Sequence, residues 1–250
     1  MTTVTDFTRT GYAELLTGLT GQGYESTSFA KADPAARHLI LRHDVDMSID
    51  AALVVAQAEA RLGVRAHYFV LLRTEMYNPW SEAGRAGLNR LRELGHEVGL
   101  HFDASLYPDH DAALDAAVAE ECAALETIIG APVTTVSFHR PVRRLQGYPG
   151  TVGGRIHAYQ PRFFHEMGYC SDSRGAWRHG HPLDHPAVAE GRALQLLTHP
   201  IWWARESPLD PVAALDAFRT ERDRVLARAL AANCDPYREA YGEDPAWPGA

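Results

Sequence analysis

The chain has 250 residues, enough for one large domain with a full hydrophobic core. Apolar residues make up 46% and charged residues 22%, which is ordinary for a globular protein and excludes a disordered or fibrous chain. The net charge is −8, and no run of basic residues is present, which argues against nucleic-acid binding as the main role. No apolar run approaches the ~18 residues of a membrane-spanning helix.

The N-terminal sequence and the cysteine spacing are typical of a protein that stays in the reducing cytoplasm. Met1–Thr10 is polar and lacks the basic and apolar segments of a standard signal peptide. Cys122, Cys170 and Cys234 are far apart and form no CxxC pair, which suits a reducing environment and argues against a cysteine zinc site. We therefore expect a cytoplasmic protein.

Short strand-like runs alternate with longer amphipathic stretches. The strand-like runs are 38–45, 66–72, 97–102, 134–139, 168–171 and 193–198. The helical stretches are 48–62, 81–94, 111–129 and 211–231. Ser48 and Ser81 are candidate N-caps, and Gly63, Gly95 and Gly130 follow three of the stretches as C-terminal caps.

This alternation predicts parallel strands joined by crossover helices, and hence an α/β fold. Six strands within about 165 residues favour a barrel or a partly closed barrel over an open sheet. We predict a single catalytic domain over 1–250, with the barrel at about 38–231 and a tail at 232–250. The glycine- and proline-rich stretch 141–161 has no helical period and is a candidate lid.

Ligands of parallel α/β folds bind at the carboxyl ends of the strands. The first predicted strand ends in a run where Arg42, Asp44 and Asp46 share one face. Two carboxylates this close repel each other unless a cation, a shared proton or an arginine stabilises them. The alternative interpretation is a solvated turn with an aspartate capping the next helix.

Three further strands also end in titratable residues. His101 and Asp103 share a face at the end of one strand, and His139 and His199 end two others. Burying so many titratable groups is costly unless a metal or ion pairs compensate. Aspartate and histidine together suit Zn²⁺ or a similar divalent ion.

Five motifs occur in a fixed order along the chain. They are Arg42–Asp46, Gly95–His101, His139–Pro141, Asp172–Trp177 and Leu196–His199. The order resembles that of the NodB-homology polysaccharide deacetylases, carbohydrate esterase family 4. The resemblance implies an irregular parallel (β/α) barrel of about seven strands that holds one divalent metal ion, Zn²⁺ with Co²⁺ or Ni²⁺ as alternatives.

The sequence departs from the family pattern at the metal ligands. Val45 separates the two aspartates, and Ser105 stands where the family usually has a second histidine. We infer that His139 supplies the third ligand beside Asp46 and His101. Asp103 and His110 are the alternatives.

The resemblance also implies roles for other residues. Asp44 would be the general base, kept ionised by the metal and by Arg140. His199 would be the general acid that protonates the leaving amine, and Asp172 would keep it protonated. The expected walls of the substrate cleft are Trp177, Trp202 and Trp203, although the last two also suit a hydrophobic core.

These observations predict a metal-dependent amide hydrolase. It would remove an N-acyl group, most simply N-acetyl, from an amino sugar or a small glycoside or glycolipid precursor. One alternative is a glycosyltransferase in which Asp44 and Asp46 form an Asp-x-Asp metal site. The other is a non-catalytic member of the fold that binds carbohydrate. We expect a small-molecule ligand, no nucleic acid and no membrane span.

Overall fold

The computed structural model describes residues 6–140 and 143–244. The chain divides into two compact units, Met1–Pro208 and Leu209–Ala250. Pro141 of the third motif, the start of the candidate lid and the last six residues of the predicted tail lie outside the described residues. The lid and the single catalytic domain stay predictions.

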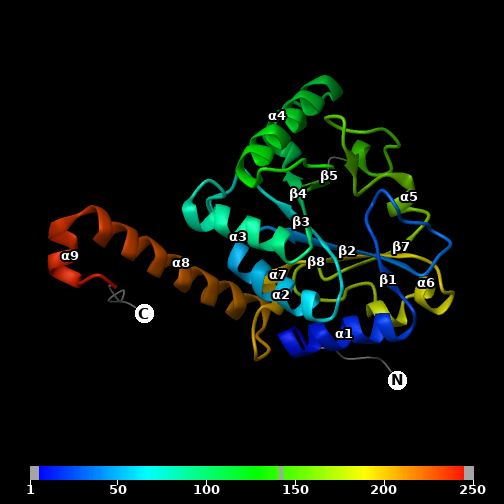
Figure 1. Ribbon diagram of the computed structural model, residues 1–250, viewed down its shortest axis with the longest axis horizontal. Helices are drawn as coiled ribbons and strands as arrows, with labels where there is room; N and C mark the ends of the chain where they lie inside the picture. Colours follow the sequence, from blue (N-terminus) through cyan, green and yellow to red (C-terminus); the bar gives the residue numbers. More distant parts are fainter. Residues whose placement is uncertain (1–5, 141–142, 245–250) are drawn as a thin grey trace. The chain divides into compact units, whose positions relative to one another are not determined.

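The first unit is built on one parallel sheet (Figure 1). Its strands are β1 (Glu25–Ser26), β2 (His38–Val45), β3 (His67–Val70), β4 (Glu97–Phe102), β5 (Thr135–Phe138), β6 (Ile156–His157), β7 (Gly168–Ser171) and β8 (Leu194–Thr198). Seven of them follow the order β6-β5-β4-β3-β2-β8-β7, and β1 pairs with β2. The predicted parallel α/β architecture of about seven strands is confirmed. No pairing joins β6 to β7 in the described part of the chain, so the barrel is incomplete there.

Helices connect the strands and cover the sheet (Figure 1). The longer ones are α1 (Arg9–Gly21), α2 (Ile49–Arg61), α3 (Glu82–Glu93) and α4 (Asp111–Ile129). Shorter helical segments are α5 (Pro161–Phe164), α6 (Pro186–Ala189), α7 (Pro200–Trp203), η1 (Ala104–Leu106), η2 (Arg143–Leu145) and η3 (Pro182–Asp184). α3 packs between α2 and α4. The predicted caps are confirmed: Ser48 and Ser81 accept hydrogen bonds from the first turns of α2 and α3, and Gly63, Gly95 and Gly130 have positive φ.

A glycine lets β4 pack closely against its neighbours. A Cβ atom on Gly99 would lie 2.6 Å from the Phe69 ring and 2.8 Å from the carbonyl oxygen of Thr135. The Phe69 ring, which is fully buried, occupies that space. Gly99 therefore allows β3, β4 and β5 to share one densely packed interior beneath the strand ends.

A carboxylate buried between β2 and α2 organises a polar cluster behind the sheet. Glu59 accepts hydrogen bonds from the hydroxyls of Tyr12 (2.5 Å) and Tyr68 (2.6 Å) and lies 2.6 Å from Nε2 of His43. Burial would raise the pKa of Glu59, but the charge and hydrogen bond of His43, the charge of His96 and the hydrogen bond of Tyr12 together outweigh it, so the pKa lies below its ordinary value. His43 also reaches Thr198 on β8 through Nδ1, at 2.7 Å. The cluster thus ties α1, α2 and three strands together.

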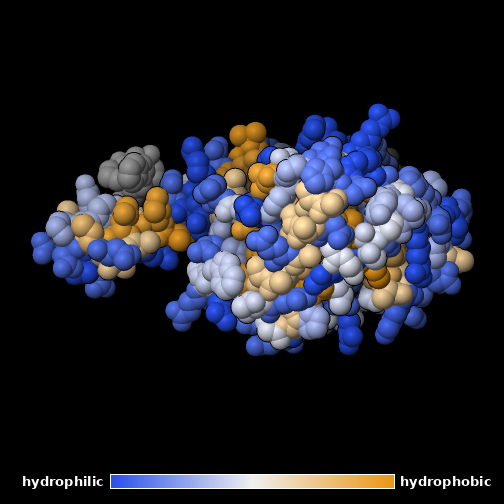
Figure 2. Space-filling view, turned by 90° about the horizontal axis from the view of Figure 1, so that it is seen from above, coloured by the Kyte–Doolittle hydropathy of each residue, from blue (hydrophilic) through white to orange (hydrophobic). Residues whose placement is uncertain are grey.

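The second unit consists of α8 (Pro211–Asn233) and α9 (Asp235–Tyr241). The tail predicted at 232–250 therefore contains a helix, which the sequence pattern did not reveal. Figure 2 shows hydrophobic surface on this unit. The large apolar side chains exposed on α8 are Val212, Leu215, Val225, Leu226 and Leu230. None of the helices in the described ranges is both long and apolar enough to cross a membrane.

Replacing Glu59 with alanine should destabilise the fold. The change leaves His43 and two tyrosine hydroxyls buried without their acceptor, which costs about 3–5 kcal/mol. Urea unfolding of the variant measures this loss. Glu93→Ala is the matched control, because Glu93 is exposed and forms only an i,i+3 ion pair with Arg90. Equal unfolding midpoints for the two variants would contradict the role given to Glu59.

A second stability prediction concerns His157 on β6. Its side chain is fully buried, and burial lowers its pKa to about 4, against the weaker opposing effect of the Tyr148 and Gly150 backbone. The unfolded chain, with a histidine pKa near 6.5, therefore binds more protons between these values, and stability falls as pH drops from about 6.5 to about 4.

His157→Phe should remove that part of the acid sensitivity. The ring lies among aromatic neighbours, 5.3 Å from Phe138 and 6.0 Å from Tyr148 between centroids, so a phenyl ring fits. As the pH falls from about 6.5 to about 4, we expect the free energy of unfolding of the parent to fall by about 1 kcal/mol per pH unit more than that of the variant. Urea unfolding at a series of pH values measures the difference in slope, and parallel curves would refute it.

Candidate metal centre

The carboxyl ends of five parallel strands meet at one edge of the sheet. β2 ends just before Asp46, and β5 ends just before His139. His101 is the residue before the last one of β4. β7 ends before Asp172, and β8 ends before His199. The predicted site residues are therefore brought to the same edge by the parallel pairing alone.

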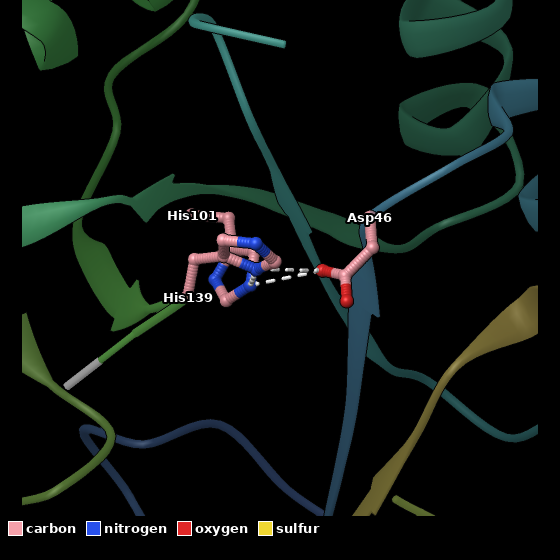
Figure 3. Close-up of side chains that lie close together, drawn as sticks. All are labelled: Asp46, His101 and His139. Atoms are coloured by element: carbon pink, nitrogen blue, oxygen red, sulfur yellow. Dashed lines mark hydrogen bonds and ion pairs between the residues drawn. The ribbon is translucent and has the colours of Figure 1, made fainter. Parts of the chain in front are cut away.

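Asp46, His101 and His139 form the centre of this edge (Figure 3). Oδ1 of Asp46 lies 3.1 Å from Nε2 of His101 and 3.3 Å from Nδ1 of His139. The two histidine nitrogens are 3.3 Å apart. Their rings meet nearly edge to face, with an interplanar angle of 80°. One ligand atom from each residue thus points to a common place.

This arrangement fits a divalent metal ion. Bonds of about 2.0–2.1 Å to zinc place tetrahedral ligand atoms about 3.3 Å apart, which matches the three separations. Oδ1 of Asp46 is also buried without a hydrogen-bond donor of acceptable geometry. A buried carboxylate oxygen in that condition is costly, and a cation would stabilise it. The donor set of one carboxylate and two imidazoles suits zinc and its neighbours.

The two alternative third ligands lie elsewhere. Oδ1 of Asp103 accepts hydrogen bonds from the backbone and side chain of Ser105, at 3.0 and 2.6 Å. His110 is exposed and caps α4 by accepting a hydrogen bond from the backbone of Ala113. Neither belongs to the group of converging ligand atoms, whereas His139 does.

Asp44 lies beside the trio but is held by an arginine. Nε and Nη2 of Arg42 donate to its two oxygens at 2.9 and 2.8 Å, and both side chains are buried. Oδ2 of Asp44 is 3.7 Å from Nε2 of His101. Burial would raise the pKa of Asp44, but the charge and hydrogen bonds of Arg42, together with the charges of His101 and His199, outweigh it, so the pKa lies below its ordinary value. The carboxylate is therefore ionised.

The partner predicted for Asp44 was wrong. Arg140 has a side chain that is 67% exposed, and its Nη1 lies 3.7 Å from Asp103 instead. Arg42 takes that place because it shares a strand face with Asp44 and its side chain runs along the interior.

The predicted pairing of His199 with Asp172 is present. Nδ1 of His199 lies 2.6 Å from Oδ1 of Asp172, and the backbone N–H of His199 donates to the same carboxylate. Burial would lower the pKa of His199, but the charge and hydrogen bond of Asp172 outweigh it and raise the pKa to about 9. Nε2 of His199 lies 3.9 Å from Oδ2 of Asp46, so the ring faces the trio.

The tryptophans do not form the open wall expected of them. Trp203 is fully buried, and its Nε1 donates to Oδ2 of Asp172 at 2.7 Å, so it positions the carboxylate. Trp202 is also buried. Trp177 is partly exposed and lies 5.8 Å from both Phe7 and Trp203 between ring centroids. Trp177 alone of the three stays a candidate for substrate contact.

Ser137 on β5 was missed by the sequence analysis. It is fully buried and lies within hydrogen-bond distance of Arg42, Asp44 and His101. The available signal was its spacing, two residues before His139, which puts both residues on one face of the predicted strand 134–139. A serine in a strand is common, however, and only the arrangement of three strands gives this one its partners.

Removing either histidine of the trio should abolish metal binding. We expect the purified protein to retain about one divalent ion per chain, and His101→Ala and His139→Ala to lose it. Elemental mass spectrometry after dialysis measures the content. His110→Ala and Asp103→Asn are the controls and should keep the ion. Retention by His139→Ala combined with loss by Asp103→Asn would contradict the assignment of the third ligand.

Comparison with known proteins gives matches to solved structures only. No family model and no curated protein matches the chain. The Streptococcus pyogenes deacetylase PplD is 13% identical, with a TM-score of 0.41, over 82% of this chain and 84% of the other. A family 4 carbohydrate esterase from Bacillus anthracis is 16% identical, with a TM-score of 0.42, over 85% of each chain.

A third match is a CE4 family pseudoenzyme from Bacillus anthracis. It is 12% identical, with a TM-score of 0.42, over 76% of this chain and 61% of the other. At these scores and identities, the likenesses assign no role to any residue of the chain. Two of the three structures carry the name of the family that the five ordered motifs resemble, carbohydrate esterase family 4.

Proposed function

We propose that the protein is a metal-dependent amide hydrolase that removes an N-acyl group, most simply N-acetyl, from an amino sugar. One observation carries the proposal. A trio of converging side chains that could hold a metal lies beside a buried carboxylate, Asp44, and beside an imidazole held by a second carboxylate, His199 with Asp172. Hydrolysis of an amide needs these three functions: an electrophile for the carbonyl, a base for water and an acid for the amine.

Asp46, His101 and His139 would hold the metal. A divalent ion there would supply Lewis-acid polarisation of the amide carbonyl and would lower the pKa of water, an effect of several kcal/mol in such sites. Asp44 accepts the proton of the attacking water through Oδ2, the oxygen nearer to His101. Arg42 holds this carboxylate in place and ionised.

His199 donates the proton that the leaving amine requires. Its Nδ1 is held by Asp172, so Nε2 is the atom that faces the trio and the substrate. The charge and hydrogen bond of Asp172 raise the pKa of His199 and thereby favour the protonated ring. Trp203 keeps Asp172 oriented from behind.

The geometry disfavours the glycosyltransferase alternative. In an Asp-x-Asp site both carboxylates face the same metal-bound diphosphate. Here Asp44 forms a bidentate ion pair with Arg42, while Asp46 lies against two histidines. That alternative also gives His199 no task.

The substrate class is part of the same proposal. We propose a small N-acylated glycoside or glycolipid precursor in the cytoplasm. The unpaired state of the chain's three cysteines, Cys122, Cys170 and Cys234, supports a reducing compartment.

The roles of Asp44 and His199 predict different losses on two substrates. Asp44→Asn should lower kcat by at least roughly 10²-fold on both an N-acetylglucosamine glycoside and an activated aryl acetate, because both need a base. His199→Gln should lower kcat on the amide by about 10²–10⁴-fold and on the aryl acetate far less, because a phenolate leaves without a proton. Steady-state kinetics with saturating metal measure both.

His110→Gln is the matched control, since His110 is exposed and caps a helix away from the trio. Metal content is measured on every variant, so that loss of turnover is separated from loss of the ion. Equal losses on both substrates in His199→Gln would contradict its role as the acid. Saccharide binding by a metal-loaded parent that turns over neither substrate would favour the non-catalytic carbohydrate-binding alternative.

A further inference from the structure

The hydroxyl of Ser137 lies at the junction of the base and the metal ligands. Its Oγ is 2.8 Å from Nη2 of Arg42, 3.0 Å from Oδ1 of Asp44 and 2.8 Å from Nδ1 of His101. All four side chains are buried, and they come from β2, β4 and β5. The hydroxyl therefore has three partners and no access to bulk water.

The protons in this junction can be placed by counting. A serine hydroxyl has one proton to donate and two lone pairs to accept. Arg42 only donates, so it takes one lone pair. Asp44, in its bidentate pair with Arg42, only accepts, so it takes the serine proton. The remaining lone pair faces His101, whose Nδ1 must then carry a proton and donate it.

The opposite arrangement is unfavourable. If Ser137 gave its proton to Nδ1 of His101, a hydroxyl lone pair would face Oδ1 of Asp44 at 3.0 Å in a buried site. Two acceptors at that distance repel, and Oδ1 of Asp44 would then keep only the hydrogen bond from Nε of Arg42. The three contacts are satisfied together in one proton arrangement.

We propose that Ser137 is a positioning residue that sets the tautomer of His101. With the proton on Nδ1, Nε2 of His101 keeps a free lone pair aimed at the place shared with Asp46 and His139. Arg42 anchors the arrangement, because it orients both Asp44 and the serine hydroxyl. The inference rests on the proposed metal centre and adds to it a link between the base and a metal ligand.

The test is the affinity for zinc, measured by competition with a chromophoric chelator. Ser137→Ala should weaken zinc binding roughly 10- to 100-fold, as removal of partners behind metal-bound histidines typically does. Ser137→Thr keeps the hydroxyl and should bind within about threefold of the parent. Thr135→Val is the matched control, because Thr135 is a buried hydroxyl residue on the same face of β5 and takes no part in the hydrogen bonds around Asp44.

Thermal unfolding of each metal-free variant shows whether it is folded, so that a loss of zinc affinity is distinguished from a loss of folding. Parent-like zinc binding by Ser137→Ala, in a parent that binds zinc tightly, would overturn the role of Ser137 and leave the metal centre standing. A parent that binds neither zinc nor cobalt would overturn the metal centre itself, and the proposed function with it. Weakening by Thr135→Val equal to that by Ser137→Ala would also overturn the inference, since it would mark a general effect on β5.

A second measurement does not depend on the variant folding. The ring ¹⁵N shifts of His101 in the zinc-loaded parent report which nitrogen carries the proton and which one binds the metal. We expect the proton on Nδ1. A proton on Nε2 would overturn the proposal.

Discussion

The buried ion pair between Arg42 and Asp44 is the constraint on which the site depends. Either charge alone in that interior would be unfavourable by several kcal/mol, so the two are retained together. The bidentate contact leaves Oδ2 of Asp44 facing the trio, and Nη2 of Arg42 also reaches Ser137 and the hydroxyl of Tyr159. The guanidinium lies over the Tyr159 ring at 4.8 Å. One arginine therefore contacts Asp44, Ser137 and Tyr159 at the same time.

The two faces of β2 carry two separate polar systems. The inner face bears Asp44, and the outer face bears His43, which pairs with Glu59 behind the sheet. The outer system also touches the site, because His43 contacts Thr198, the residue before His199. The ends of β2 and β8, which carry Asp44 and precede His199, are thereby fixed relative to each other. The same strand thus contributes to a buried polar cluster on one side and to the candidate site on the other.

The corrections have a common physical cause. Arg140 follows a strand, and its long side chain reaches solvent and Asp103. Trp203 follows another strand, but the short helix α7 turns its ring into the core, where it donates to Asp172. Residues beyond a strand end have no fixed face, since period-two alternation stops there. Strand spacing correctly grouped Arg42 with Asp44 and could not say which arginine the carboxylate would meet.

The sequence by itself determined the parallel α/β class, the main strands and helices with their caps, and the edge where the chemistry lies, because these follow from local periodicity and chain direction. Two-residue strands such as β1 and β6 and the four-residue helices have no period and were not predictable. The sequence left Asp103 and His110 as alternatives to His139, and only the tertiary structure brings His139 together with Asp46 and His101. Neighbouring strands lie about 4.8 Å apart, so β2 and β5 would be roughly 14 Å apart in a flat sheet. Only the curl of the sheet brings Asp46 and His139 to 3.3 Å.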